Sequence, residues 1–213
     1  HMMPNKHEWE KIVSYMGISN NDEVIIYDNS DLFSSCRCWF NFIYFGHDQN
    51  LLSILDGGLK KWKLEGKFTT NKIPKIIKSN YCARENREMV KSKKQIKDNI
   101  KKKYFKLLDA RSLDRFYGKS PEPRPGLRAG NIKNSHCLPF LNLLNLKTNE
   151  FKKESEIKTE FEKIIKNIED KNLVFTCGSG ITASVLAFAY SIVNKDYTPI
   201  IYDGSWSEYG RYP

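Results

Sequence analysis

The stretch LVFTCGSGITASVLAFAY, residues 173–190, decides the fold. Its first four residues, three apolar residues and a threonine, predict a buried strand, and its last nine predict a buried helix. A single cysteine, Cys177, stands where the strand turns into the helix, and Gly-Ser-Gly follows it at once. A loop that closes onto a helix N-terminus directs successive backbone N–H groups at one centre, so it stabilises negative charge.

We interpret Cys177 as a nucleophile, because the thiolate is the reactive form of cysteine and such a loop favours it. Gly178 and Gly180 let the backbone approach the sulfur without a Cβ clash, and Ser179 can supply one more hydrogen bond. The alternative is a buried, inert cysteine, since free cysteine is among the most buried residue types. Its position at a strand end, within Gly-Ser-Gly and before a helix, favours the nucleophile.

Three other loops with this geometry do not fit the residues. A phosphate-binding loop needs Gly-Lys-Ser/Thr before its helix, and the lysine is missing. A cysteine phosphatase needs an arginine six residues after the cysteine, where this chain has Ala183. A dinucleotide-binding loop needs a third glycine, which is also missing. What remains is a thiolate loop without a fixed cation, which suits an anionic sulfur carried on the cysteine itself, a persulfide.

The chain contains two units of matching layout. VIIY (24–27) leads into a loop, a helix, the strand LLSIL (51–55) and Asp-Gly; near the chain end, LVFT leads into the Cys177 loop, a helix, the strand TPIIY (198–202) and again Asp-Gly. Such units predict two related α/β halves with parallel sheets. In the first unit, Asp28 occupies the position that corresponds to Cys177. We therefore expect no nucleophile in the first unit.

The second unit has further elements in front of its repeat. Residues 105–108 predict a strand, and the prolines in GKSPEPRPGLRAG (118–130) prevent regular structure. A helix follows whose apolar residues share one face: Ile157, Phe161, Ile164, Ile165 and Ile168. We therefore expect a partial, non-catalytic domain over 1–70, a linker over 71–103, and the catalytic domain over 104–213.

Lysine dominates the charge of the chain. The formal net charge is +10, but lysines occur along the whole sequence. The densest basic segment, 89–104, places Met89, Ile96 and Ile100 at helical spacing, which predicts a solvated amphipathic helix in the linker. We do not expect a nucleic-acid partner, although sulfur delivery to tRNA stays as a third alternative because of this segment.

Several classes of protein are not indicated. An apolar run of 18 residues is missing, so we expect no membrane-spanning helix. A secretion-signal pattern is missing too, so we expect a cytoplasmic location and reduced thiols at all five cysteines. Cys36 and Cys38 are one residue apart, a spacing that fits no zinc site. We expect no metal and no organic cofactor.

The loop CGSGITA (177–183) resembles the active-site loop of 3-mercaptopyruvate sulfurtransferases, in the tandem-domain rhodanese superfamily. LLDARSLDRF, PEPRPGLRAG, LPF and YDGSWSEYG resemble the second domain of that family. VIIYDNSDLFSSCRCWFNFIYFGH and SILDGGLKKW resemble the later half of its first domain. Thiosulfate-using rhodaneses usually carry basic residues in the loop, so Gly178 and Ser179 point to mercaptopyruvate, with thiosulfate as the alternative donor.

The resemblance implies a fold and a reaction. The fold would be α/β, a rhodanese-like parallel sheet with helices on both faces, in one complete domain plus a partial repeat. Cys177 would take sulfur from mercaptopyruvate as a persulfide, release pyruvate, and pass the sulfur to a thiol, thioredoxin-like or cyanide acceptor. Arg115 and Arg124 would bind the carboxylate and keto oxygen of this small anionic donor, because a guanidinium matches a carboxylate bidentately.

The remaining loop residues also take roles from the resemblance. Ser179 would assist proton transfer or hold the sulfur, and the active-site loop would comprise Gly178, Gly180, Ile181 and Thr182. The family's first domain begins with a strand and an Asp- and His-bearing segment that this sequence does not match. We therefore expect the first domain to be N-terminally incomplete, and we expect self-association or binding of a leading segment through residues 1–70. The alternative function is a catalytically weak rhodanese-fold binding or sulfur-carrier module.

Overall fold

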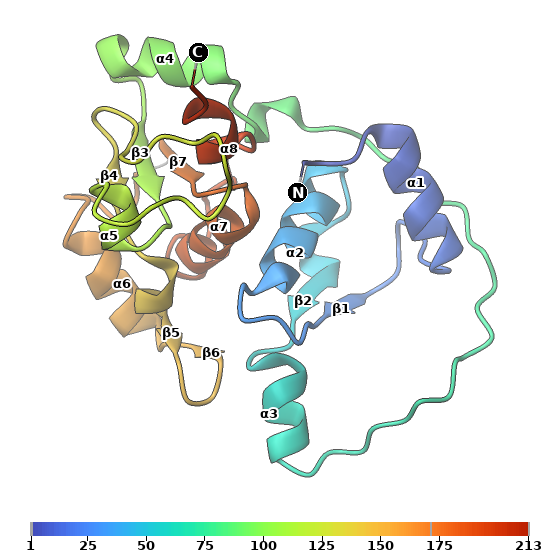
Figure 1. The fold of residues 1–213 in the computed structure, drawn as a ribbon. Coiled ribbons are helices and arrows are strands. Elements are labelled where there is room, and N and C mark those ends of the chain that lie inside the picture. The colour runs from blue at the N-terminus through green and yellow to red at the C-terminus, as the bar shows by residue number, and fades with distance from the viewer. Residues whose placement is uncertain (1, 171, 213) are drawn as a thin grey trace.

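The computed structural model describes residues 2–170 and 172–212. Figure 1 shows a first unit that contains α1 to α3, a long connection on the outside, and a second unit that contains α4 to α8. The elements follow one another in this order: α1 Lys6–Tyr15, β1 Val24–Ile26, α2 Ser34–Tyr44, a 3₁₀ turn Gln49–Leu51, β2 Leu52–Ile54, α3 Gly58–Leu64, a 3₁₀ turn Arg87–Met89, α4 Lys93–Lys102, β3 Lys106–Asp109, α5 Leu113–Phe116, β4 His136–Cys137, a 3₁₀ turn Phe140–Leu143, β5 Leu144–Asn145, β6 Glu150–Phe151, α6 Glu154–Glu162, β7 Leu173–Thr176, α7 Ile181–Val193 and α8 Ser205–Tyr209.

Each unit has its own parallel sheet. In the first unit, β1 pairs with β2, and Ile25 lies opposite Ser53. In the second unit the strand order is β4-β3-β7, and both pairings are parallel. The antiparallel hairpin of β5 and β6 was not predicted. The α/β class, with parallel sheets connected through helices, is confirmed.

Helices cover both faces of the second sheet. On one face, the ring of Phe175 in β7 packs against Phe161 of α6 and Tyr190 of α7. On the other face, Val174 lies in a buried cluster with Ile96 of α4 and Trp206 of α8. All four residues of β7 are buried for this reason, which accounts for the continuous apolar run in the sequence.

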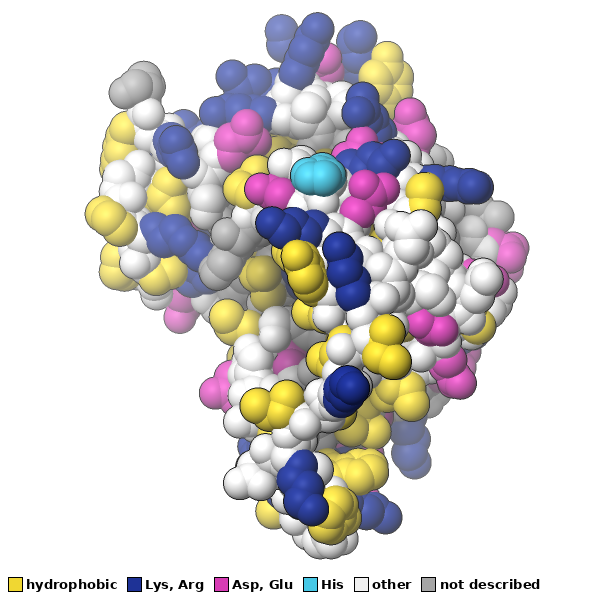
Figure 2. Space-filling model, turned by 90° about the vertical axis from the view of Figure 1, so that its right-hand side faces the viewer, with side chains coloured by type: hydrophobic (Ala, Val, Ile, Leu, Met, Phe, Trp, Pro, Cys, Tyr) yellow, Lys and Arg dark blue, Asp and Glu magenta, His cyan; other side chains and the backbone are white. Residues whose placement is uncertain are grey.

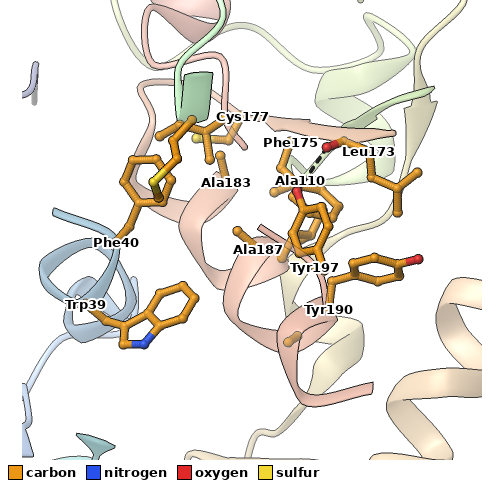
Figure 3. Close-up of a cluster of buried hydrophobic side chains, with 14 of the residues drawn as sticks. Trp39, Phe40, Ala110, Leu173, Phe175, Cys177, Ala183, Ala187, Tyr190 and Tyr197 are labelled. Atoms are coloured by element: carbon orange, nitrogen blue, oxygen red, sulfur yellow. Dashed lines mark hydrogen bonds between the residues drawn. The ribbon is translucent and has the colours of Figure 1, made fainter. Parts of the chain in front are cut away.

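The two units pack together through α2 and α7. Figure 3 shows Trp39 and Phe40 pointing from α2 toward α7, with Cys177 beside the N-terminal end of α7. The ring centroid of Trp39 lies 5.0 Å from that of Phe188. Beside these aromatic contacts, the buried Arg37 of α2 donates a hydrogen bond to the carbonyl of Gly180 at the start of α7. The first unit therefore forms one wall beside the Cys177 loop.

The strand predicted over 198–202 is reduced to single bridges. Ile201 forms one parallel bridge to Phe175 and one to Val90. Its position beside β7 agrees with the prediction, but a full ladder does not form. Pro199 lacks the N–H group that a longer ladder would use, and the Ile200 N–H bonds to the hydroxyl of Tyr197.

The helix predicted to extend to Ile168 is shorter. α6 ends at Glu162, so the prediction was wrong for its last turn. Ile165 is still buried in the main core, although it stands outside the helix. The backbone carbonyl of Ile168 accepts hydrogen bonds from Tyr190 and Asn194 of the α7 region. These tertiary bonds hold the segment that follows α6 against α7.

The basic helix of the connection is present as α4, shorter than the basic segment itself. Ile96 is buried, and the dark blue side chains at the upper end of Figure 2 gather where α4 lies. The preceding stretch combines exposed Phe68 and Ile73 with buried Tyr81 and Met89. Its later part therefore packs against the main core, and the domain boundaries stay a prediction.

Candidate active site

Cys177 lies directly after β7 and is 2% exposed. Its Sγ accepts hydrogen bonds from the backbone N–H groups of Ser179, at 3.4 Å, and Gly180, at 3.1 Å. Gly180 has φ +84°, a left-handed conformation that glycine adopts without strain. α7 begins at the next residue, Ile181, so the positive end of the helix also faces the loop. The sulfur thus lies where negative charge is stabilised.

The start of α8 holds the other side of the loop. The N–H of Cys177 donates to the hydroxyl of Ser205 at 3.2 Å, and the N–H of Trp206 donates to the carbonyl of Cys177 at 2.9 Å. The N–H of Ser207 donates to the carbonyl of Gly178 at 2.9 Å. Ser205 has φ +49°, which is uncommon for a residue with a side chain. These α8 residues were not predicted to support the loop.

Arg115 and Arg124 converge on Gly178. A Cβ at that glycine would lie 2.9 Å from Nη2 of Arg115 and 3.8 Å from Nη1 of Arg124. Nη2 of Arg124 also donates to the hydroxyl of Ser179 at 3.1 Å. The loop 118–130 brings Arg124 back to the thiol from a distant position in the sequence. The two guanidinium groups predicted to bind substrate therefore lie at the loop that holds the sulfur.

A buried ion network orients Arg115. Glu122, with a side chain 1% exposed, accepts from Nη2 of Arg115 at 2.7 Å and from Nη1 of Arg111 at 2.8 Å. Arg111 is fully buried and also pairs with Asp109 at 2.7 Å. Arg111 and Asp109 thus hold the centre of this network. Glu122 was missed, although it stands in the same Pro-Glu-Pro-Arg motif as Arg124.

We expect Glu122→Gln to lower the free energy of unfolding by about 1–3 kcal/mol, because buried charges lose a charged partner. Arg115 would also lose its fixed orientation, so the KM for an anionic donor should rise. Chemical denaturation and steady-state kinetics measure the two effects. Glu160→Gln, at a surface pair with Lys163, is the matched control and should change neither. An unchanged KM would mean that Glu122 does not orient Arg115.

The remaining thiols differ in environment from Cys177. Burial raises the pKa of Cys38 to about 11 and that of Cys137 to about 12. Burial also raises the pKa of Cys36. Cys82 is exposed, in the connection between the units. Three of the four other cysteines are therefore held in the unreactive thiol form.

We expect neutral iodoacetamide, at about pH 8, to modify Cys177 and Cys82 before the three raised-pKa cysteines, because the thiolate is the reacting form. Raising the pH toward about 11 should bring Cys38 into reaction first, since ionisation begins as pH approaches the pKa. Peptide mass spectrometry of the alkylated chain measures this order. Early modification of Cys36 in the folded protein would contradict it, and the unfolded chain serves as the control.

Within residues 2–170 and 172–212, histidine, cysteine and acidic side chains do not gather into a group that could hold a metal ion. In the same part of the chain, the helices are too short or too polar to cross a lipid bilayer.

The site and the fold together define a class of protein. A parallel α/β domain presents a cysteine at a strand end, within backbone N–H groups and beside two arginines. Proteins of that class can transfer a group through a cysteine, because backbone N–H groups and guanidinium groups stabilise negative charge. Residues 1–65 and 92–211 match the family model of the rhodanese-like domain. The chain belongs to the rhodanese family.

Individual relatives agree with this assignment. The mitochondrial thiosulfate/3-mercaptopyruvate sulfurtransferase 1 of Arabidopsis thaliana is 32% identical over all of this chain and 60% of its own length. The 3-mercaptopyruvate sulfurtransferase of Homo sapiens is 34% identical over 98% of this chain and 69% of its own. The crystal structure of SseA, a 3-mercaptopyruvate sulfotransferase from Escherichia coli, has a TM-score of 0.82 at 27% identity, over 98% of this chain and 76% of that one. The chain thus spans about two thirds of the length of its relatives.

Proposed function

We propose that this protein is a sulfurtransferase that moves sulfur from 3-mercaptopyruvate, through a persulfide on Cys177, to a thiol or cyanide acceptor. The observation that carries the proposal is the pair of N–H groups, from Ser179 and Gly180, directed at the Sγ of Cys177. Curated relatives named as 3-mercaptopyruvate sulfurtransferases support it. Gly178, Ile181 and Thr182 complete the loop that carries these groups.

The proposed reaction balances without a cofactor. The Cys177 thiolate attacks the sulfur of mercaptopyruvate, an S–S bond forms, and the C–S bond breaks. The electron pair of that bond goes to carbon as the enolate of pyruvate, which then takes a proton. In the second half, the acceptor attacks the outer sulfur, and Cys177 leaves as the thiolate. The N–H groups at Sγ stabilise the negative charge at both ends of the cycle.

The polar side chains at the loop have separate roles in binding the donor and in handling the transferred sulfur. Arg115 and Arg124 bind the carboxylate and keto oxygen of the donor, since both guanidinium groups approach Gly178. This interaction also stabilises the enolate as it forms. Ser179 is placed to hold the transferred sulfur or to pass a proton, because its hydroxyl is already oriented by Arg124.

Incubation with 3-mercaptopyruvate tests the proposal directly. We expect release of pyruvate and the addition of one sulfur atom to the peptide that contains Cys177, both measurable by mass spectrometry. Thiosulfate, supplied in parallel with cyanide as acceptor, measures the donor preference. If Cys177 gains no sulfur from either donor, the chain is better described by the alternative, a catalytically weak binding or sulfur-carrier module. A thioredoxin-like protein and small thiols are the acceptors to compare, and a salt-dependent RNA gel shift would test tRNA delivery.

The cytoplasmic location is likewise a proposal. One relative is named as mitochondrial, and mitochondria are therefore the competing location. Fractionation of cells that express the natural gene measures it. Enrichment in mitochondria would contradict a cytoplasmic protein.

We further propose that the sheet of the first unit takes up another strand. Ile25 and Tyr27 of the β1 region are 62% and 59% exposed, whereas the matching Val174 and Thr176 of the β7 region are each 1% exposed. β7 lies between β3 and Ile201, but β1 pairs with β2 alone among the described strands. Exposed sheet edges and apolar patches tend to recruit a further chain. The partner is a second copy or a leading segment, bound through residues 1–70.

Sedimentation at micromolar concentration tests this association. We expect the parent chain to self-associate, and Ile25→Lys to weaken association by placing a charge on the exposed face of β1. Ile73→Lys, in the connecting stretch, is the control and should leave association unchanged. Adding a peptide that supplies the leading family segment distinguishes the two partners. A stable monomer that ignores the peptide would contradict the proposal.

A further inference from the structure

Arg37 is a buried arginine that the proposed reaction does not use. It lies in α2 of the first unit and is 6% exposed. Arginine is rarely buried unless it is paired, and this side chain extends from α2 to the start of α7. Its signal in the sequence is a single charge inside an aromatic-rich helix, SSCRCWFNFIY.

The guanidinium of Arg37 contacts the Cys177 loop at Gly180, whereas Arg115 approaches the loop at Gly178. Nη1 donates to the carbonyl of Gly180 at 3.1 Å, and Nη2 donates to Oδ1 of Asp203 at 2.5 Å. Asp203 is 5% exposed, and its other oxygen accepts from the N–H of Met3 at 3.2 Å. A buried, charge-assisted pair of this kind fixes its geometry more firmly than a surface pair.

The pair packs directly against the glycine that faces the sulfur. A Cβ at Gly180 would lie 2.7 Å from Oδ1 of Asp203 and 3.0 Å from Nη1 of Arg37. The carbonyl of Gly180 is held by Arg37, while its N–H points to the Sγ of Cys177 at 3.1 Å. Together with the hydroxyl of Ser184, which also donates to this carbonyl, the guanidinium therefore limits the rotation of the Gly180 backbone.

Asp203 connects the ion pair to the start of α8, which also binds the Cys177 loop. It stands two residues before Ser205, whose hydroxyl accepts from the N–H of Cys177. The residues that follow, Trp206 and Ser207, donate to the carbonyls of Cys177 and Gly178. One buried ion pair thus braces both segments that hold the thiol, and its cation comes from the unit that carries Asp28 in place of a cysteine.

We propose that Arg37 and Asp203 form a positioning pair, through which the non-catalytic first unit holds the Gly180 N–H against the sulfur of Cys177. This inference rests on the proposed role of Cys177 as the nucleophile. It gives the first unit a function in the reaction although that unit has no thiol at the matching place.

The rate of Cys177 alkylation by neutral iodoacetamide, measured across pH in the full chain, tests the pair without any sulfur donor. The charged groups around the loop are Arg37, Asp203, Arg115 and Arg124. We expect Arg37→Met and Asp203→Asn each to slow alkylation about tenfold near neutral pH and to move the midpoint of the pH profile upward. Arg37→Lys should fall between parent and Arg37→Met, because it keeps the charge but loses the two-donor geometry.

The two neutralising variants separate positioning from simple charge. A purely electrostatic effect would move the midpoint in opposite directions, since one variant removes a cation and the other removes an anion. That result would overturn the inference, as would unchanged profiles in folded variants. Trp39→Phe, in the same interface between α2 and α7, is the stability control and should leave the profile unchanged. Failure of mercaptopyruvate to load sulfur onto the parent would refute the proposed function, while the alkylation profiles would still decide the role of Arg37.

Discussion

Cys177→Ser is expected to lower pyruvate release from 3-mercaptopyruvate by more than about 10³-fold, because the variant loses its nucleophile. A serine hydroxyl does not ionise under these conditions, even with two N–H groups directed at it. It also cannot carry the transferred sulfur as a persulfide. Pyruvate release at saturating donor and the mass of the active-site peptide measure the two losses.

The fold should survive this substitution. Serine is close to cysteine in size, and the backbone bonds from α8 to the loop do not involve the sulfur. The thermal midpoint of the variant should therefore remain close to that of the parent. Cys82→Ser, at an exposed thiol outside the site, is the matched control and should keep full activity. A Cys177→Ser protein that still releases pyruvate at a rate near the parent's would refute the persulfide mechanism.

The strand and helix on either side of Cys177 were predictable because their patterns are local. β7 occupies Leu173–Thr176, as these residues indicate, and α7 begins one residue before the predicted start. Glycine and a strand end narrow the backbone choices at the loop. Those choices bring the N–H groups of Ser179 and Gly180 toward the sulfur.

The residues that brace the loop could not be identified in the same way. Glu122, Arg37 and Asp203 act on the site through contacts that join segments far apart in the sequence. Arg37 in particular comes from the first unit. The spacing of residues in the sequence does not show that its side chain reaches the Cys177 loop. A lone charge in an apolar helix signals a buried partner, but it does not say which one.

The predicted end of the helix α6 was wrong for a related reason. The apolar pattern of Ile164, Ile165 and Ile168 continues at helical spacing, yet α6 ends at Glu162. In the segment that follows, Tyr190 and Asn194 bind the carbonyl of Ile168. Tertiary hydrogen bonds decide such boundaries, and local propensity decides them only weakly. The Cys177 loop was more predictable than the residues that support it, because the loop is one short segment of the sequence.

Arg115→Ala and Arg124→Ala should each reduce kcat/KM for 3-mercaptopyruvate by about 10- to 100-fold, the value of one charge-assisted hydrogen bond. Alkylation of Cys177 by neutral iodoacetamide should change much less, because that reagent has no carboxylate for a guanidinium to bind. Lysine at either position should restore only part of the lost kcat/KM, since it keeps the charge but lacks the planar, bidentate geometry. Arg128→Ala is the control and should change kcat/KM little, because the guanidinium of Arg128 stacks on Trp206 and Tyr209. Equal losses toward both reagents would mean that the two arginines support the loop through Gly178 and Ser179 and do not read the substrate.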